Sequence, residues 1–238
     1  MGARRLIGRY RPSRVRERRH IEERVALSQR VSAMLDGTVA RGPFAGMRMP
    51  EVLPDTSAKL LGSYEEELHP TLERLLGGDF DVVVNVGCSD GYYAVGALRR
   101  LSAARGVAFD LNESFRKATA ATAAANHVEL KIESTCSPAR LRELAGTSRV
   151  LVICDCEGCE RDLIEPETTG LASIVVELHP GTEDLAQRYG AGYVVTLVES
   201  TGRDPSGYPE LATLASEERS LAVFERMEPQ TWAVIEPA

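Results

Sequence analysis

Residues 81–96, DVVVNVGCSDGYYAVG, limit the possible folds more than any other stretch of this chain. They begin with a valine-rich strand typical of a buried position, continue through a tight turn at Gly87 and Gly91, and lead into a helix that begins at Tyr92. Glycine permits a sharp turn and lets the backbone approach a ligand closely. The first N–H groups of a helix lack partners within the helix, so they can face a polar or anionic group. The stretch therefore predicts a site for a nucleotide-like ligand.

From this stretch onward, Val/Ile/Leu-rich segments alternate with helical patterns, and the connections are short. The segments are nearly continuous in apolar residues, as parallel strands covered on both faces should be. The predicted strands are 81–86, 106–111, 128–133, 149–155, 172–178 and 192–199, with a last strand at 221–225 or 231–235. The predicted helices lie near 91–103, 113–125, 138–145, 159–165, 182–189 and 210–220. This order predicts a doubly wound, Rossmann-like α/β sheet with its ligand at the carboxyl ends of the strands.

The N-terminal part, residues 1–60, differs from the domain predicted at 61–238. Residues 1–30 carry ten Arg against three Glu, so the first segment is basic although the whole chain has a net charge of −7. A helix is expected from about Ser13, with a thin apolar side formed by Ile21, Val25, Leu27 and Val31. It is either an arm for a substrate, RNA or a membrane surface, or a solvated helix that packs on its own acidic domain or on a second subunit. The packed helix is favoured because charged helices are usually solvated faces.

Composition excludes several classes of protein. A net charge of −7 argues against a general nucleic-acid binder, which needs a broad basic surface. No run of about 18 apolar residues is present, so no membrane span is expected, and the basic N-terminus lacks the apolar segment of a signal peptide. Five cysteines, three of them within 154–159, do not resemble a secreted disulfide framework. We therefore expect a cytoplasmic protein with reduced thiols.

Acidic side chains follow several of the predicted strands. Asp110 lies 23 residues after Gly87, where a carboxylate can accept hydrogen bonds from two ribose hydroxyls. The alternative is that Asp110 only caps the helix that begins at Glu113. If the fourth and fifth strands are neighbours, Asp155, Glu157, Glu177 and His179 converge, and convergent titratable groups in a cleft indicate a functional site.

These motifs resemble the FkbM-type class I methyltransferases. The resemblance rests on DVVVNVGCSDGYYAVG, on Asp110 and above all on DCEGCE followed by VVELH, and it extends upstream to GPFAGM and LLGSYEEEL. It implies a seven-stranded, mainly parallel sheet whose last strand is antiparallel. It also implies S-adenosylmethionine as the cofactor and methyl transfer, commonly to an oxygen of a small metabolite, sugar or polyketide.

The resemblance also implies roles for single residues. The glycine turn would contact the methionine part of the cofactor, Asp110 its ribose, Ser134–Cys136 the adenine, and Asp155 the amino group. The full expected cofactor set is Asn85, Gly87, Ser89, Asp90, Gly91, Asp110, Asn112, Thr135, Asp155 and Glu157. Asn85 stands where related enzymes usually have Asp or Glu, so Asp90 or Glu67 is a candidate source of the missing negative charge.

A hydroxyl acceptor must lose its proton during methyl transfer. His179 is the first candidate base, since histidine titrates near neutrality, and Asp155 is the second. Asp155, Glu157, Glu177 and His179 form an alternative site for a hard divalent metal, although the default expectation is catalysis without one. A zinc site of Cys154, Cys156 and Cys159, with Cys88 as a candidate fourth ligand, is disfavoured because the usual two C-x2-C pairs are missing.

The expected partner is a small-molecule methyl acceptor. Two alternatives remain: an RNA or protein methyltransferase guided by the Arg-rich N-terminus, and a catalytically silent cofactor-binding module. A homodimer is also an open expectation. Of Tyr92 and Tyr93, one is expected to pack in the core and the other to line the cofactor mouth, and Trp232 is expected in the core.

Overall fold

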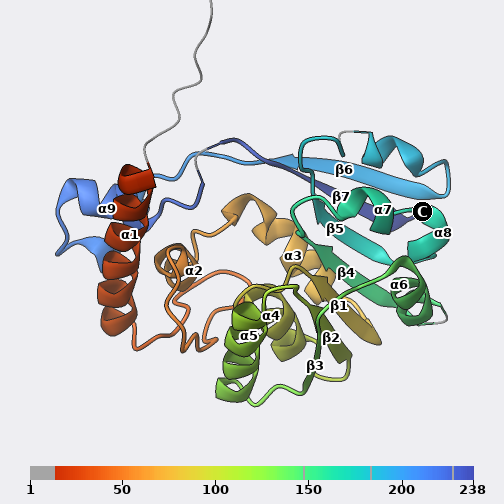
Figure 1. The fold of residues 1–238 in the computed structure, drawn as a ribbon, viewed down its shortest axis with the longest axis horizontal. Helices are drawn as coiled ribbons and strands as arrows, with labels where there is room; N and C mark the ends of the chain where they lie inside the picture. Colours follow the sequence, from red (N-terminus) through yellow and green to blue (C-terminus); the bar gives the residue numbers. More distant parts are fainter. Residues whose placement is uncertain (1–13, 147, 183, 227) are drawn as a thin grey trace, which may run out of the picture.

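One seven-stranded sheet organises the chain (Figure 1). The structure is a computed structural model that describes residues 14–146, 148–182, 184–226 and 228–238. The strand order is β3-β2-β1-β4-β5-β7-β6. The strands are β1 Val82–Val86, β2 Arg105–Phe109, β3 Leu130–Glu133, β4 Val150–Cys154, β5 Ser173–Glu177, β6 Tyr193–Glu199 and β7 Thr231–Pro237. β1 to β5 are parallel, whereas β7 runs antiparallel to β5 and β6. The expected fold, mainly parallel with the last strand antiparallel, is confirmed.

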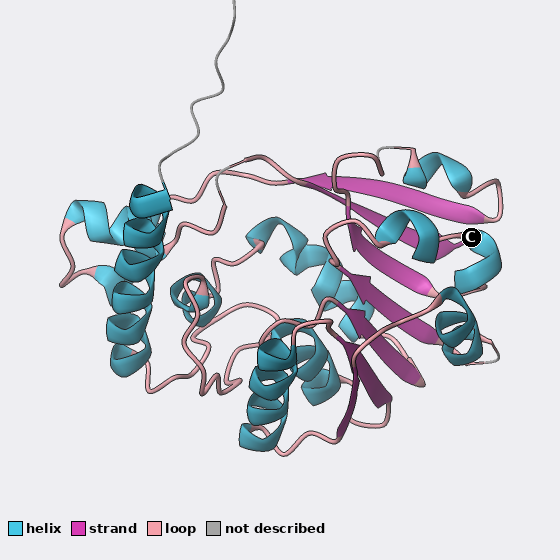
Figure 2. Cartoon of the chain, viewed as in Figure 1, coloured by secondary structure: helices cyan, strands magenta, loops and turns pink. Residues whose placement is uncertain are grey.

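Helices cover both faces of this sheet (Figure 2). The described α-helices are α1 Arg14–Met34, α2 Thr56–Leu61, α3 His69–Leu76, α4 Tyr92–Arg100, α5 Glu113–Ala125, α6 Pro138–Ala145, α7 Glu160–Leu163, α8 Pro166–Thr169 and α9 Ser216–Ala222. On one face, β-strand residues such as Val83 and Ile153 pack with α3 and α4. On the other, Val84 and Val152 pack with α6 and α7. The central strands β1, β4 and β5 are therefore buried on both sides, which explains their continuous apolar sequences.

Two helix predictions were wrong in extent. The helix expected at 159–165 is divided into α7 and α8, because Glu165 precedes Pro166 and takes an extended backbone with φ −137° and ψ 150°. Among the described residues of 182–189 the structure forms only a 3-10 helix, Leu185–Arg188. The helix expected at 210–220 lies later in the chain, as α9.

The N-terminal segment packs on its own chain. Leu27 and Val31 of α1 are buried in the same apolar cluster as Phe44 and Met47 of the following loop, whereas Ile21 is exposed. α1 contacts α2 and α9. The favoured interpretation of a charged helix packed on its own domain is therefore confirmed for the described part of α1. None of the described helices combines the length and the apolar character that a membrane crossing requires.

The last strand lies inside the sheet rather than at its edge. β7 is inserted between β5 and β6, so 231–235 was the correct alternative for the final strand. Trp232 of β7 is fully buried in the core, as expected. β6 forms one edge of the sheet, and Val194 and Leu197 of this strand are more than half exposed.

Candidate functional site

A cavity of about 360 Å³ opens at the carboxyl ends of β1 to β4. This volume lies within the usual range for small-molecule sites. Six of the expected cofactor residues line it: Gly87, Ser89, Asp110, Thr135, Asp155 and Glu157. The other lining residues are Val86, Phe109, Leu111, Phe115, Ser134, Cys136, Cys156 and Cys159. The cavity therefore joins the glycine turn, the end of β2, the segment after β3 and the loop after β4.

Gly87 lies where the chain leaves β1 and passes against the loop after β4. Its φ of +79° is in the region that favours glycine, and a Cβ at this position would lie 1.6 Å from the carbonyl oxygen of Asp155. The N–H groups of Gly87 and Cys88 donate to the carbonyl of Phe109 at 2.9 and 3.0 Å. Only glycine fits this close approach.

Asp110 holds the end of β2 against the glycine turn. Its Oδ2 accepts a hydrogen bond from the N–H of Ser89 at 3.0 Å, and its Oδ1 accepts one from the N–H of Asn112 at 2.8 Å. The side chain that caps α5 is that of Asn112, which accepts from the N–H of Ser114. The alternative in which Asp110 caps this helix is therefore wrong. Asn112 does not contribute to the described lining of the cavity.

Asp90 and Glu67, the two candidate replacements for a charge at position 85, already pair with cations. Asp90 is fully buried; its Oδ2 lies 2.8 Å from Lys59 Nζ, and its Oδ1 accepts from the N–H of Tyr92 at 3.3 Å. Glu67 pairs with Arg203 at 2.5 Å. In the described part of the chain neither Asp90 nor Glu67 lines the cavity.

Asn85, in β1, and Gly91, before α4, lie at the two ends of the glycine turn and pack against neighbouring elements. The Nδ2 of Asn85 donates to the carbonyl of Ile153 at 3.1 Å, while its buried Oδ1 accepts no hydrogen bond from a described residue. Gly91 has φ +85° and precedes α4, and a Cβ added to it would lie 3.2 Å from Thr119. Both residues lie outside the described lining of the cavity.

The tyrosines after the glycine turn both pack in the core. Tyr92 and Tyr93 are less than a tenth exposed, and their rings contact Phe44 and Tyr64 edge-on or tilted. The expectation that one of them lines the cofactor mouth was wrong. Apolar side chains that the sequence analysis missed, Leu111 and Phe115, form that part of the wall.

The residues that follow β4 and β5 converge, as expected for neighbouring strands. The Nε2 of His179 lies 3.6 Å from Asp155 Oδ1, 3.4 Å from Glu157 Oε2 and 3.8 Å from Glu177 Oε1. These three carboxyl groups lie around the Nε2 atom of the imidazole. His179 and Glu177 are buried, whereas Glu157 is exposed.

Glu160 is the member of this cluster that the expected site lacked. Its Oε1 lies 2.9 Å from His179 Nδ1 and accepts from the N–H of Cys156 at 2.8 Å, and its Oε2 accepts from the N–H of Gly158 at 2.7 Å. Glu160 is fully buried at the start of α7. Its place in DCEGCE was the only sequence signal for it.

Burial changes the acidity of two carboxyl groups in the cluster. Desolvation raises the pKa of Asp155 to about 6, with His179 opposing the shift and Glu157 adding to it. Desolvation likewise raises the pKa of Glu177 to about 9, and the negative charges of Asp155 and Glu65 add to the effect. Arg226, with Nη1 3.6 Å from Glu177 Oε1, opposes the second shift.

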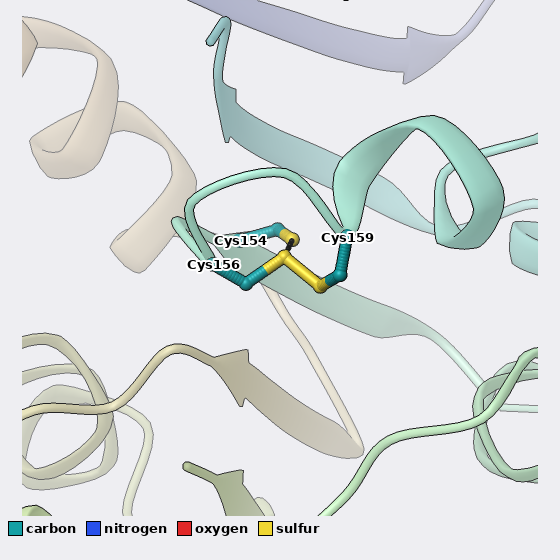
Figure 3. A group of neighbouring side chains, drawn as sticks. All are labelled: Cys154, Cys156 and Cys159. Atoms are coloured by element: carbon teal, nitrogen blue, oxygen red, sulfur yellow. Dashed lines mark hydrogen bonds between the residues drawn. A yellow bond between two sulfur atoms is a disulfide. The ribbon is translucent and has the colours of Figure 1, made fainter. Parts of the chain in front are cut away.

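A disulfide joins Cys156 and Cys159 at the cavity wall, and Cys154 Sγ lies 3.7 Å from Cys156 Sγ (Figure 3). The expectation of reduced thiols is therefore wrong for this pair, while Cys88, Cys136 and Cys154 are free. The two spacings C-x-C and C-x-x-C do not distinguish a metal site from a bridge, and the turn at Gly158 brings Cys159 back to Cys156. This bond joins two of the four cysteines of the disfavoured zinc site.

No protein-family model matches the chain, and no curated protein matches its sequence. Solved structures similar to it include a precorrin-6y C5,15-methyltransferase from Geobacter metallireducens, with TM-score 0.49, 15% identity and coverage of 70% of this chain and 85% of that one. An O-methyltransferase from Bacillus cereus in complex with SAH has TM-score 0.49, 13% identity and coverage of 91% and 100%. The O-methyltransferase of tomaymycin synthesis from Streptomyces achromogenes, in complex with SAM, has TM-score 0.44, 16% identity and coverage of 90% of both chains.

The strand order and the antiparallel β7 give this chain the class I methyltransferase fold.

Proposed function

We propose that this chain is an S-adenosylmethionine-dependent methyltransferase of the FkbM type that methylates an oxygen of a small molecule. One observation carries the proposal. The cavity at the carboxyl ends of β1 to β4 has a glycine turn on one side and Asp110, at the end of β2, on another. In an open α/β sheet this is the position at which nucleotide-like ligands bind.

The residues that line the cavity fit this cofactor. Gly87 lines the cavity without a side chain, so the methionine part of the ligand can approach the backbone closely. Each oxygen of Asp110 accepts one backbone N–H, which leaves further lone pairs for the two ribose hydroxyls. Phe109, Leu111 and Phe115 supply an apolar wall for a planar base beside Thr135.

When bound, the cofactor supplies an electrophilic methyl group, so the protein has mainly to orient an acceptor in line with it. Asp155 lines the cavity where the turn after β1 meets the loop after β4. The cluster of His179 with its surrounding carboxylates lies directly beside Asp155 and marks the acceptor side. A hydroxyl acceptor loses its proton to this cluster, with His179 Nε2 and Asp155 as the candidate groups.

The charge of the cluster favours a small neutral or cationic acceptor over RNA. Asp155 and Glu157 are carboxyl groups near the proposed reaction centre, and their negative charges would repel the phosphates of a nucleic acid. The described part of the basic α1 packs against α2 and α9 instead of the cavity. The RNA methyltransferase alternative therefore has less support than a small-molecule enzyme.

Titration calorimetry with S-adenosylhomocysteine tests the proposal. The wild-type chain should bind the ligand, and Asp110→Ala should bind about 5- to 100-fold more weakly, because hydrogen bonds to a charged group contribute roughly 1–3 kcal/mol. Asp79→Ala is the matched control, since Asp79 is exposed and pairs only with Arg149 among described residues. No binding by the wild type at millimolar ligand would overturn the proposal.

A second experiment identifies the acceptor. The protein is incubated with methyl-labelled cofactor and an extract of its source organism, and the labelled product is separated by size. Label in a fraction resistant to nuclease and protease supports a small-molecule acceptor. Label that nuclease releases from a large product would favour RNA instead.

A further inference from the structure

Three buried polar atoms in the cluster after β4 and β5 face one another without hydrogen bonds. They are His179 Nε2, Asp155 Oδ1 and Glu177 Oε1, and none of them has a hydrogen-bond partner among the described residues. The side chain of Glu177 is only 3% exposed, and that of His179 only 10%. A buried polar atom without a partner costs roughly 1–3 kcal/mol, so three together indicate a missing component.

The hydrogen bonds of His179 determine which ring nitrogen is available. Nδ1 lies 2.9 Å from Glu160 Oε1, and a carboxylate can only accept, so Nδ1 carries the proton and donates it. In this tautomer the lone pair of Nε2 faces the side chains of Asp155, Glu157 and Glu177. A lone pair directed at the carboxylates of Asp155 and Glu157 is repulsive unless a positive charge lies between them.

The distances among these atoms have the right size for a shared cation. The separations of 3.4 to 3.8 Å from Nε2 to the three carboxylate oxygens are too long for hydrogen bonds. Two ligands on one ion, each bound at roughly 2.0–2.3 Å, lie about 3.0–3.8 Å apart. Two of these side chains, Asp155 and His179, also form a group with the neighbouring Glu160 in which one ligand atom of each lies within 4.8 Å of the others.

We propose that Asp155, Glu157, Glu177 and His179 bind a divalent cation, with Mn²⁺ as the best-fitting ion. Carboxylate oxygens suit Mg²⁺ and Mn²⁺, while an imidazole ligand favours a transition metal, and Mn²⁺ satisfies both preferences. Glu160 is the outer partner that orients the ligating imidazole through Nδ1, an arrangement common around metal-binding histidines.

One protein cation lies close to this site and partly balances its charge. Arg226 Nη1 is 3.6 Å from Glu177 Oε1, but Arg226 also pairs with Glu65 and lies 3.9 Å from Glu225. One guanidinium shared among three carboxylates leaves the charge of Asp155 and Glu157 uncompensated. The bound ion supplies that compensation.

Binding of the ion does not depend on the proposed function, but its catalytic consequence does. A cation on Nε2 excludes a proton from the same atom, so His179 then acts as a ligand and not as the base. Glu157 is exposed, so the site has an open side toward solvent and the cavity. An acceptor with two neighbouring oxygens can occupy that side, where the cation lowers the pKa of its hydroxyl.

Titration of the full chain with MnCl₂ after EDTA treatment and dialysis tests the site, with free Mn²⁺ measured by electron paramagnetic resonance. The wild type should bind one Mn²⁺ per chain. His179→Gln and Glu177→Gln should each weaken binding at least about 100-fold. Glu129→Gln, at a position far along the chain from the cluster, is the control and should leave binding unchanged.

Binding of S-adenosylhomocysteine, measured on the same samples, shows that each variant is folded and separates the two proposals. Cofactor binding without any Mn²⁺ binding at millimolar metal would overturn the metal site and leave the methyltransferase in place. Equal Mn²⁺ affinity in the wild type and both variants would also overturn it. If a variant does not fold, thermal unfolding of the wild type decides the matter, because Mn²⁺ must raise its Tm.

Discussion

Lys59 Nζ lies 2.8 Å from Asp90 Oδ2, and the two side chains are 3% and 0% exposed. The same ammonium group lies 2.8 Å from Asp55 Oδ2. Burial opposes the charge on Lys59, but the two carboxylates hold its pKa above the ordinary value. This buried pair fastens α2, in the N-terminal segment, to the glycine turn that borders the cofactor cavity.

Replacing Lys59 by Met should therefore destabilise the protein strongly. The substitution leaves the fully buried Asp90 without its cation, a loss that typically costs about 3–5 kcal/mol of unfolding free energy. Urea unfolding measures the change. Lys117→Met is the matched control, because Lys117 forms an exposed pair with Glu113 and should change stability by less than about 1 kcal/mol. Equal stability of the two variants would contradict the structural role of the pair.

Gly87→Ala should be among the most damaging single-methyl substitutions in this chain. The added Cβ would lie 1.6 Å from a backbone oxygen of Asp155, so two strand ends must separate, and the φ of +79° adds strain. We expect a loss of roughly 3 kcal/mol or more, measured by urea unfolding. Gly202→Ala, where a Cβ meets no atom within 4 Å, should be nearly neutral. A neutral Gly87→Ala would show that the two strand ends do not approach so closely.

Glu65 should make the stability of the fold depend on pH. Burial raises its pKa to about 8 from 4.5, although Arg226 and Tyr93 oppose the shift. The folded chain therefore keeps a proton that the unfolded chain has lost, so this contribution is fully present below about pH 4.5 and is lost as pH rises to about 8. The difference in unfolding free energy between wild type and Glu65→Gln should change by at most about 1.4 kcal/mol per pH unit within that window.

Urea unfolding at intervals from pH 5 to 9 measures this difference. Glu66→Gln is the control, since Glu66 is an exposed neighbour and should follow the wild type across the range. A difference that stays constant with pH in Glu65→Gln would contradict a raised pKa.

The disulfide predicts a definite number of reactive thiols. Protein purified without reductant and unfolded in guanidinium should give three thiols per chain with a thiol reagent, because Cys156 and Cys159 are bridged. After reduction the same sample should give five, the full cysteine content. Five thiols before reduction would contradict the bridge. The double variant with Ser at both positions should give three in either case.

The strands of the sheet were predictable because each central strand leaves its own apolar run in the sequence. Segments such as 81–86 and 149–155 are buried on both faces, and this leaves continuous apolar runs in the sequence. The helix expected at 159–165 is divided in the structure because Pro166 favours an extended backbone at Glu165. This steric restriction outweighs the helical spacing of the apolar residues. The weak pattern after residue 200 did not decide between two positions for the last strand, since that strand is chosen by its neighbours β5 and β6.

The candidate site was predictable where an acidic residue directly follows a predicted strand. Asp110 and Asp155 line the cavity for this reason. Asp90 looked like a ligand because it is acidic and lies in the glycine turn, but its partner Lys59 is distant in sequence. The roles of Glu160 and of the bridge at Cys156 depend on the turn geometry at Gly158, which no spacing rule contains.

The insertion of β7 between β5 and β6 has a consequence for folding. Among the described strands β6 pairs with β7 alone, so β6 has no partner strand until β7 is in place. Until Thr231–Pro237 is in place, the edges of both β5 and β6 stay open, and open edges readily pair with other chains. Val194 and Leu197, which stay exposed even in the finished sheet, increase this risk. The chain is therefore most prone to aggregate before β7 has been inserted between β5 and β6.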